Sequence, residues 1–111
     1  MVDTVTWPGL SGKSYQMNLL QFSKSFVNDA GVYIFCKPSA TQGRWDAVYV
    51  GECEDFDDRL NKNLASHHRW ECIKRQGATN VCALTVPGGK LSRTAVETDL
   101  RQRLDPPCNR Q

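Results

Sequence analysis

Apolar residues in the first quarter of the chain repeat at the spacing of an α-helix. Tyr15, Leu19 and Phe22 lie three or four positions apart, and Ser14 precedes them as a suitable N-cap. An apolar stripe of this kind is typical of an amphipathic helix that packs on a core. The pattern therefore predicts a helix over residues 15–27, ended by an Asn-Asp pair.

Two runs rich in β-branched and aromatic residues follow this segment. Residues 31–36 (GVYIFC) and 45–51 (WDAVYVG) have the composition of strands, and the segment between them contains a proline, a glycine and polar residues. Together they predict a β-hairpin with a rather long loop. A similar run at residues 80–86 (NVCALTV), ended by Pro-Gly-Gly, predicts a third strand.

Helical spacing returns in the second half of the chain. It predicts one helix capped by Asp55, a second capped by Ser66, and a third over residues 93–104 that ends before two prolines. A length of 111 residues fits one domain. We therefore expect residues 1–111 to form a single α+β domain in which helices pack around a small sheet.

The composition is typical of a globular protein that does not enter a membrane. Hydrophobic residues make up 40% and charged residues 23% of the chain. Apolar stretches stay well below the roughly 18 residues that a membrane-spanning helix needs. The first residues show neither the basic leader nor the apolar core of a signal peptide, so we expect a cytoplasmic protein with no membrane partner.

The five cysteines are an odd number and form no Cys-x-x-Cys motif, which indicates neither a disulfide framework nor a zinc ribbon. We therefore expect free thiols in a reducing compartment. His68 and Cys72 have the i, i+4 spacing of two ligands on one helical face, but two ligands do not make a zinc site. A half-buried thiol is the favoured interpretation of Cys72.

Positive charge is concentrated in the C-terminal part of the chain, although the net charge is only +2. Residues 1–68 contain six Lys or Arg and eight acidic residues, whereas residues 69–111 contain eight and four. A phosphate-binding face would draw on this cationic part, and the alternative for each cation is a solvated helix surface. The candidate residues are Arg69, Lys74, Arg75, Arg93 and Arg101.

A set of widely spaced residues says more about function than the composition does. It consists of Gly31-Val32-Tyr33, Tyr49-Val50-Gly51, Arg59, Glu97 and Asn109. The arginine follows the second tyrosine by ten residues, and the asparagine follows the glutamate by twelve. The set resembles the GIY-YIG nuclease family over residues 29–110. This resemblance implies a three-stranded antiparallel sheet flanked by helices, with the tyrosines on its first two strands.

The resemblance also implies metal-dependent hydrolysis of DNA phosphodiesters. Glu97 would be the protein ligand of one Mg²⁺ or Mn²⁺ ion, which keeps most of its waters. Tyr49 or Tyr33 would act as the general base or relay protons to it, with a phenol pKa lowered by the cation and Arg59. Arg59 would also hold the scissile phosphate with its planar set of donors.

The remaining motif residues would shape the site. Asn109 would hold its geometry by hydrogen bonds, and Gly31 and Gly51 would leave space where backbone or nucleic acid approaches closely. Taken singly, the motif residues also have structural interpretations. The tyrosines suit half-buried strand positions, the glutamate could pair with arginines one helical turn away, and Arg59 could pair with Asp55.

Two features depart from the usual family pattern. Several members carry a histidine four residues after the arginine, where this chain has Asn63; His67 or His68, one turn further on, can take this place and contact nucleic acid. The second feature is a cluster of carboxylates close to Arg59, which would repel a polyanion. The carboxylates are Glu52, Glu54, Asp55, Asp57 and Asp58.

We therefore expect a metal-dependent DNA endonuclease of low intrinsic sequence specificity. Family members usually carry a separate DNA-recognition module, for which 111 residues leave no room, so a protein partner is one source of specificity. Two other classes stay open. One is a catalytically weak or inactive module that binds nucleic acid or protein, and the other is a small structural protein with core residues at the motif positions.

Overall fold

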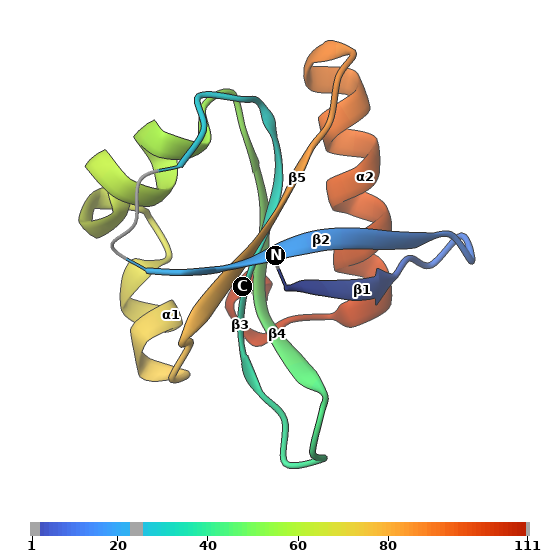
Figure 1. The fold of residues 1–111 in the computed structure, drawn as a ribbon, viewed down its shortest axis with the longest axis vertical. Helices are drawn as coiled ribbons and strands as arrows, with labels where there is room; N and C mark the ends of the chain where they lie inside the picture. The colour runs from blue at the N-terminus through green and yellow to red at the C-terminus, as the bar shows by residue number, and fades with distance from the viewer. Residues whose placement is uncertain (1–2, 23–25, 111) are drawn as a thin grey trace.

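The computed structural model describes residues 3–22 and 26–110 and shows an α+β fold on one five-stranded antiparallel sheet (Figure 1). The strand order is β1-β2-β5-β3-β4. The expected three-stranded sheet is therefore wrong, because two strands precede the predicted hairpin. The strands are β1 (Thr4–Pro8), β2 (Ser14–Gln21), β3 (Gly31–Pro38), β4 (Trp45–Cys53) and β5 (Asn80–Thr85).

Two α-helices and three short helical turns accompany the sheet in the described part of the chain. They are the π-helical turn η1 (Asp58–Lys62), the 3-10 turn η2 (Leu64–Ser66), α1 (Trp70–Arg75), α2 (Gly89–Leu104) and the 3-10 turn η3 (Pro107–Asn109). Figure 1 shows α1 and α2 on opposite sides of the sheet. The predicted C-terminal helix is present and begins four residues earlier than expected, at Gly89.

The helix predicted over residues 15–27 is wrong, because strand β2 occupies this part of the chain. Side chains alternate along β2: Met17 is 1% exposed, whereas its neighbours Gln16 and Asn18 are exposed. Of the apolar residues that indicated a helix, Tyr15 and Leu19 also fit this alternation, whereas Phe22 packs on the other face of the sheet, and pairing with β1 and β5 decides for the strand. Residues 23–25 of the predicted helix lie outside the described residues.

The N-terminal hairpin of β1 and β2 is attached to helix α2 through one carboxylate. Gly12 in its turn has φ +92°, a conformation that favours glycine. The Asp99 carboxylate of α2 accepts hydrogen bonds from the hydroxyls of Ser11 and Tyr15, both at 2.7 Å. Together with the pairing of β2 with β5, this contact fixes the two additional strands to the rest of the domain.

Strand β3 is buried on both faces of the sheet. It pairs with β4 along one edge and with β5 along the other. Tyr33 and Phe35 pack on the face covered by η1 and α1, while Val32 and Ile34 pack on the face covered by α2, and all four are 0% exposed. A polar group on β3 must therefore find its hydrogen-bond partners within the protein.

A disulfide joins Cys72 of α1 to Cys108 of η3, so the expectation of free thiols is wrong for these two residues. Their sequence separation of 36 residues explains why no local motif revealed the pair. The bond also removes Cys72 from consideration as a zinc ligand. Cys36, Cys53 and Cys82 are buried thiols.

The alternation along β2 leads to a prediction about stability. We expect Met17→Ala to lower the free energy of unfolding by about 2–4 kcal/mol, because it removes a buried side chain and leaves a cavity. The matched control Asn18→Ala should change stability by less than about 0.5 kcal/mol, because this neighbour points to solvent. Denaturant unfolding measures both. Equal effects of the two substitutions would contradict the strand and its register.

Candidate active site at the edge of strand β4

The hydroxyl of Tyr33 is the most deeply buried polar group of the motif residues. Its Oη lies 2.7 Å from Nε2 of His67, which is itself 7% exposed. The backbone N–H of Arg69 donates to Nδ1 of the same ring at 3.0 Å. Because Nδ1 accepts, the neutral ring carries its proton on Nε2 and donates it to Tyr33. His67 therefore orients this tyrosine, a role more specific than the expected contact with nucleic acid.

Arg59 provides a second donor for the same oxygen. Arg59 belongs to η1; its Nη1 lies 3.5 Å from Oη of Tyr33, and the residue is half-buried. The expected alternative, an ion pair with Asp55, does not occur among the described residues, because that carboxylate accepts hydrogen bonds from Asn28 and from the backbone of Asp58. Two donors thus converge on Tyr33, and its own O–H remains available as a donor.

Tyr49 lies on β4 beside this network and is 8% exposed. Its ring centroid is 6.2 Å from that of Tyr33 and 5.1 Å from that of His67, with an edge contact to the imidazole. His68 is exposed and stacks on His67 with ring centroids 4.9 Å apart. Tyr49 and His68 thus lie at the solvent side of the cluster, while the first tyrosine lies beneath them.

Burial controls the protonation of this cluster. It raises the pKa of Tyr33, and it also raises the pKa of Tyr49, where the charge of Glu97 adds to the effect. Burial, with His68 and Arg59 nearby, lowers the pKa of His67 to about 4. At neutral pH both phenols are therefore protonated and the imidazole is neutral.

Glu97 reaches the site from helix α2. Its side chain is 19% exposed, and Oε1 lies 3.4 Å from Nε of Arg101, one helical turn further on. The Thr98 hydroxyl lies 3.5 Å from Oε2. The expected alternative, an ion pair on the helix surface, is thus present with Arg101, and the same carboxylate acts electrostatically on Tyr49.

The donor set suits a hard divalent cation held by few protein ligands. Among the described residues no three His, Cys, Asp or Glu side chains group as metal ligands. A cation at this place would have the Glu97 carboxylate as its protein ligand and would need to keep its waters, as Mg²⁺ and Mn²⁺ can. Both carboxylate oxygens of Glu97 have only long contacts, 3.4 and 3.5 Å, so lone pairs remain for a ligand bond.

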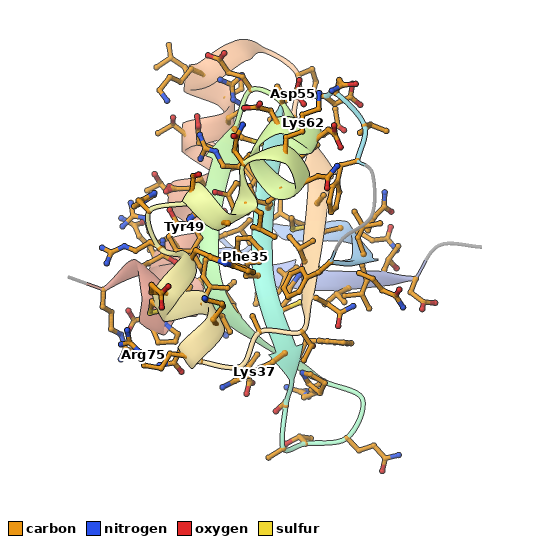
Figure 2. The ribbon with its side chains drawn as sticks, turned by 90° about the vertical axis from the view of Figure 1, so that its left-hand side faces the viewer. Phe35, Lys37, Tyr49, Asp55, Lys62 and Arg75 are labelled. Carbon is orange, nitrogen blue, oxygen red and sulfur yellow. A yellow bond between two sulfur atoms is a disulfide. The ribbon has the colours of Figure 1, made fainter. Side chains whose placement is uncertain are left out.

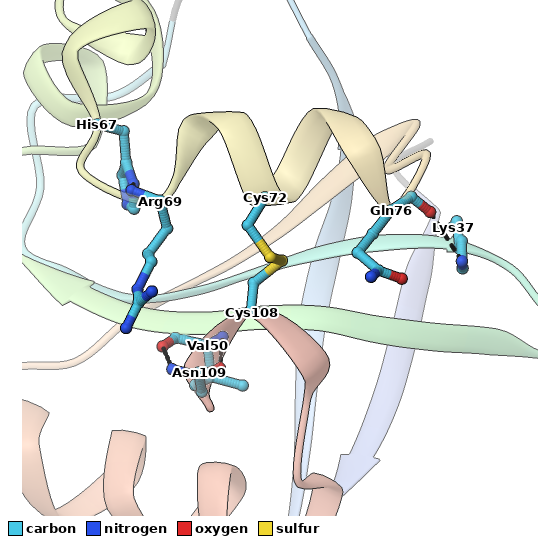
Figure 3. The surroundings of a disulfide bond; sticks show 8 residues. All are labelled: Lys37, Val50, His67, Arg69, Cys72, Gln76, Cys108 and Asn109. Carbon is cyan, nitrogen blue, oxygen red and sulfur yellow. Dashed lines mark hydrogen bonds between the residues drawn. A yellow bond between two sulfur atoms is a disulfide. The ribbon is translucent and has the colours of Figure 1, made fainter. Parts of the chain in front are cut away.

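Asn109 holds the edge of β4 from the C-terminal turn η3. Its Oδ1 accepts the N–H of Val50 at 2.8 Å, and its Nδ2 donates to the carbonyl of Val50 at 2.9 Å (Figure 3). Val50 lies between Tyr49 and Gly51 in the second motif. One amide side chain therefore takes the place of a neighbouring strand, which agrees with its expected role in holding geometry.

The two motif glycines are positions of close approach. A Cβ at Gly51 would lie 2.5 Å from Oη of Tyr33 and 2.9 Å from Cε2 of Tyr49. A Cβ at Gly31 would collide with the backbone carbonyl of Leu84 on β5. Gly51 therefore leaves room for the two phenols, and Gly31 leaves room for the neighbouring strand.

The predicted phosphate-binding cations do not form one face. Arg69 and Arg101 are half-buried and act electrostatically on Tyr49, as Arg59 does. Lys74 and Arg75 lie further along α1, where Lys74 pairs with Glu71 at 3.4 Å, and Figure 2 shows Arg75 apart from Tyr49. These two residues are exposed but belong to another part of the surface.

Arg93, another of the predicted phosphate-binding residues, is 5% exposed, so its guanidinium is not open to solvent in this structure. It lies 3.6 Å from Oε1 of Glu52, which Lys90 approaches at 3.1 Å. Glu52 is thus neutralised by two cations, and the repulsion that we expected from it is cancelled locally. Asp57 is also buried and accepts the backbone N–H of Phe26 at 3.0 Å.

The comparisons with known proteins do not assign the chain to a family. Scans against protein-family models, curated proteins and solved structures gave no match. Within residues 3–22 and 26–110, no helix is long and apolar enough to cross a membrane.

The lowered pKa of His67 leads to a prediction about pH. The unfolded ring takes up a proton near its ordinary pKa of 6.5, whereas the folded ring does so only near 4, so stability falls as the pH drops through this window. His67→Gln keeps a donor for Tyr33 without this titration. Between pH of about 7 and 4.5, the wild type should lose roughly 1–2 kcal/mol more than this variant.

Denaturant unfolding at several pH values measures this difference. His68→Gln is the matched control, because His68 is exposed and adjacent in sequence. The control keeps the buried imidazole, so its stability should still fall more steeply with pH than that of His67→Gln, although less steeply than that of the wild type, because His68 contributes to the lowered pKa of His67. If His67→Gln lost stability as steeply as the control, the imidazole would not be the buried neutral donor that we infer.

Proposed function

We propose that this protein is a GIY-YIG-type endonuclease that hydrolyses DNA phosphodiesters with one bound Mg²⁺ or Mn²⁺ ion. The observation that supports this most is the convergence of five side chains from separate elements at the edge of β4. They are Tyr33, Tyr49, Arg59, His67 and Glu97. The sheet has two strands more than the family resemblance implied, and both tyrosines lie on adjacent strands β3 and β4.

The two tyrosines have different roles in this proposal. The oxygen of Tyr33 already receives donors from His67 and Arg59, so this phenol donates its proton and positions its neighbours. Tyr49 is nearer to solvent and contacts the attacking water. A phenol with a raised pKa is a weak base at neutral pH, so the substrate complex must lower the pKa of Tyr49 for proton abstraction.

Charge stabilisation is divided between arginines and the cation. Arg59 has donors that are not used by carboxylates among the described residues, so it can hold a phosphate oxygen while it contacts Tyr33. Arg69 and Arg101 add positive potential around Tyr49. Glu97 would hold the cation, which, when bound, neutralises phosphate charge and lowers the pKa of nearby water and phenol.

DNA is the proposed substrate, with a protein partner as a source of sequence specificity, and the proposed location is the cytoplasm. A second candidate function is a non-catalytic module that binds nucleic acid or protein. The observation that favours it is the low exposure of both phenols, 0% for Tyr33 and 8% for Tyr49, which limits their access to a substrate. Cleavage and binding must therefore be measured separately.

The first test concerns the proposed metal ligand. We expect Glu97→Gln to abolish cation-dependent cleavage with little change in stability, because it removes a partly exposed carboxylate and no core contact. Glu71→Gln is the matched control, because the Glu71 side chain is exposed on α1, and this variant should keep wild-type activity. Cleavage is assayed with Mg²⁺ or Mn²⁺ on single-stranded, duplex and branched DNA and on RNA. Binding without cleavage in wild type and both variants would support the non-catalytic module instead.

The second test separates the two tyrosines. Tyr49→Phe should lower the cleavage rate by about 10²-fold, the usual scale for general acid-base catalysis. Tyr33→Phe should weaken activity less and should also lower the pKa of His67 further, because the charged imidazole loses the oxygen that accepts its Nε2–H and its pocket becomes more apolar. NMR titration of His67 together with single-turnover rates measures both. A larger rate loss for Tyr33→Phe than for Tyr49→Phe would reverse the roles.

A further inference from the structure

The disulfide joins two segments that each hold one part of the site. Cys72 lies in α1 and Cys108 in η3, with their Cα atoms 5.8 Å apart (Figure 3). Cys108 is 0% exposed and packs in the same core cluster as Tyr33 and Tyr49. The bond therefore belongs to the core cluster that contains the two tyrosines of the proposed active site.

On the α1 side, the held group is the imidazole of His67. The backbone N–H of Arg69, the residue that precedes α1, donates to its Nδ1 and thereby directs Nε2 toward Tyr33. Helix α1 has only six residues, and no side chain among the described residues caps its N-terminus. A helix this short depends on tertiary contacts, so the disulfide is a major restraint on its position.

On the η3 side, the held group is the amide of Asn109, the residue after Cys108. It makes both hydrogen bonds to Val50, between Tyr49 and Gly51 of the second motif. Turn η3 has three residues. The ion pair between Asp105 before it and Arg110 after it has both side chains exposed to solvent. The disulfide therefore restrains the segment that fixes the edge of β4.

We infer that the Cys72–Cys108 disulfide is a redox-sensitive brace: the oxidised form holds the site in its ordered arrangement, and reduction loosens both Asn109 and His67. This inference rests on the proposed nuclease function where it concerns activity. In the proposed cytoplasmic location the bond would be reversible, because disulfides in a reducing compartment are usually transient and redox-sensing. Such a brace would switch the enzyme on under oxidising conditions.

The chemistry is ordinary exchange with a dithiol. One thiolate of the dithiol attacks Sγ of Cys72, which is half-buried, whereas Cys108 is closed to solvent. The protein S–S bond breaks, and Cys108 leaves as a thiolate that takes up a proton. The second thiol then displaces Cys72 as a thiol and closes the disulfide of the reductant. Two electrons and two protons pass to the protein.

The experiment compares oxidised, dithiol-reduced and reoxidised full-length protein. Mass spectrometry after thiol alkylation verifies each state. On reduction, the amide hydrogen of Val50, which donates to Asn109, should exchange at least about tenfold faster. The amide of Leu19, which donates to the carbonyl of Asp3 far from the disulfide, is the control and should change little.

Cation-dependent DNA cleavage is measured on the same samples. It should fall roughly 10- to 100-fold on reduction and return on reoxidation, because small displacements in an active site have effects of this size. The variant Cys72→Ser/Cys108→Ser should behave as the reduced form in both conditions. Cys53→Ala, which removes a buried thiol outside the pair, should keep the redox response.

Three results would overturn the brace. The first is that alkylation finds five free thiols in the protein purified under air. The second is that the amide exchange rate of Val50 does not change after verified reduction. The third is that the amide exchange of Leu19 accelerates as much as that of Val50, which would indicate global unfolding. A sample that cleaves no substrate in either state would refute the nuclease proposal, while the exchange of Val50 would still decide the brace. If the double serine variant fails to fold, the reduced wild type provides the same comparison.

Discussion

The buried hydroxyl of Tyr33 is the constraint on which the arrangement of the site depends. Strand β3 is paired on both edges and covered on both faces, so water cannot satisfy this hydroxyl. An unpaired hydroxyl in such a position would cost roughly 1–3 kcal/mol. The chain supplies His67 and Arg59 as partners, and in doing so it brings η1 and the start of α1 against the tyrosine motifs. The need to satisfy this hydroxyl therefore accounts both for the packing of these segments on the sheet and for the grouping of the candidate catalytic side chains.

Strand β4 presents the complementary problem, because it is the edge of the sheet. An unpaired edge presents free N–H and C=O groups and is open to pairing with other chains. The amide of Asn109 covers the centre of this edge at Val50, and the disulfide of Cys108 attaches the covering turn to α1. The outer tyrosine, Tyr49, therefore remains close to solvent while its backbone stays fixed. Access and rigidity are obtained together at the same strand.

Parts of this arrangement could be predicted from the sequence, and other parts could not. Local composition identified strands β3, β4 and β5 and helix α2, because β-branched runs and helical spacing are local properties. The strand containing Met17 was mistaken for a helix, since the spacing of Tyr15 and Leu19 fits both periods and only pairing decides. The contact of His67 with Tyr33 and the pairing of Cys72 with Cys108 span 34 and 36 residues, so no local pattern contains them.

The charges near the site show why net charge is a poor guide to its electrostatics. Arg93 and Lys90 both form ion pairs with Glu52. Charges that lie far apart in the sequence thus neutralise each other in the folded protein. Around Tyr49, by contrast, the charges that act are three arginines and one glutamate. Three positive charges and one negative charge leave +2 around this tyrosine, which equals the net charge of the whole chain, so the positive excess is concentrated in one region. Because Coulomb interactions strengthen as water is excluded, this local excess would act on a phosphate in the proposed complex more strongly than the exposed carboxylates near η1.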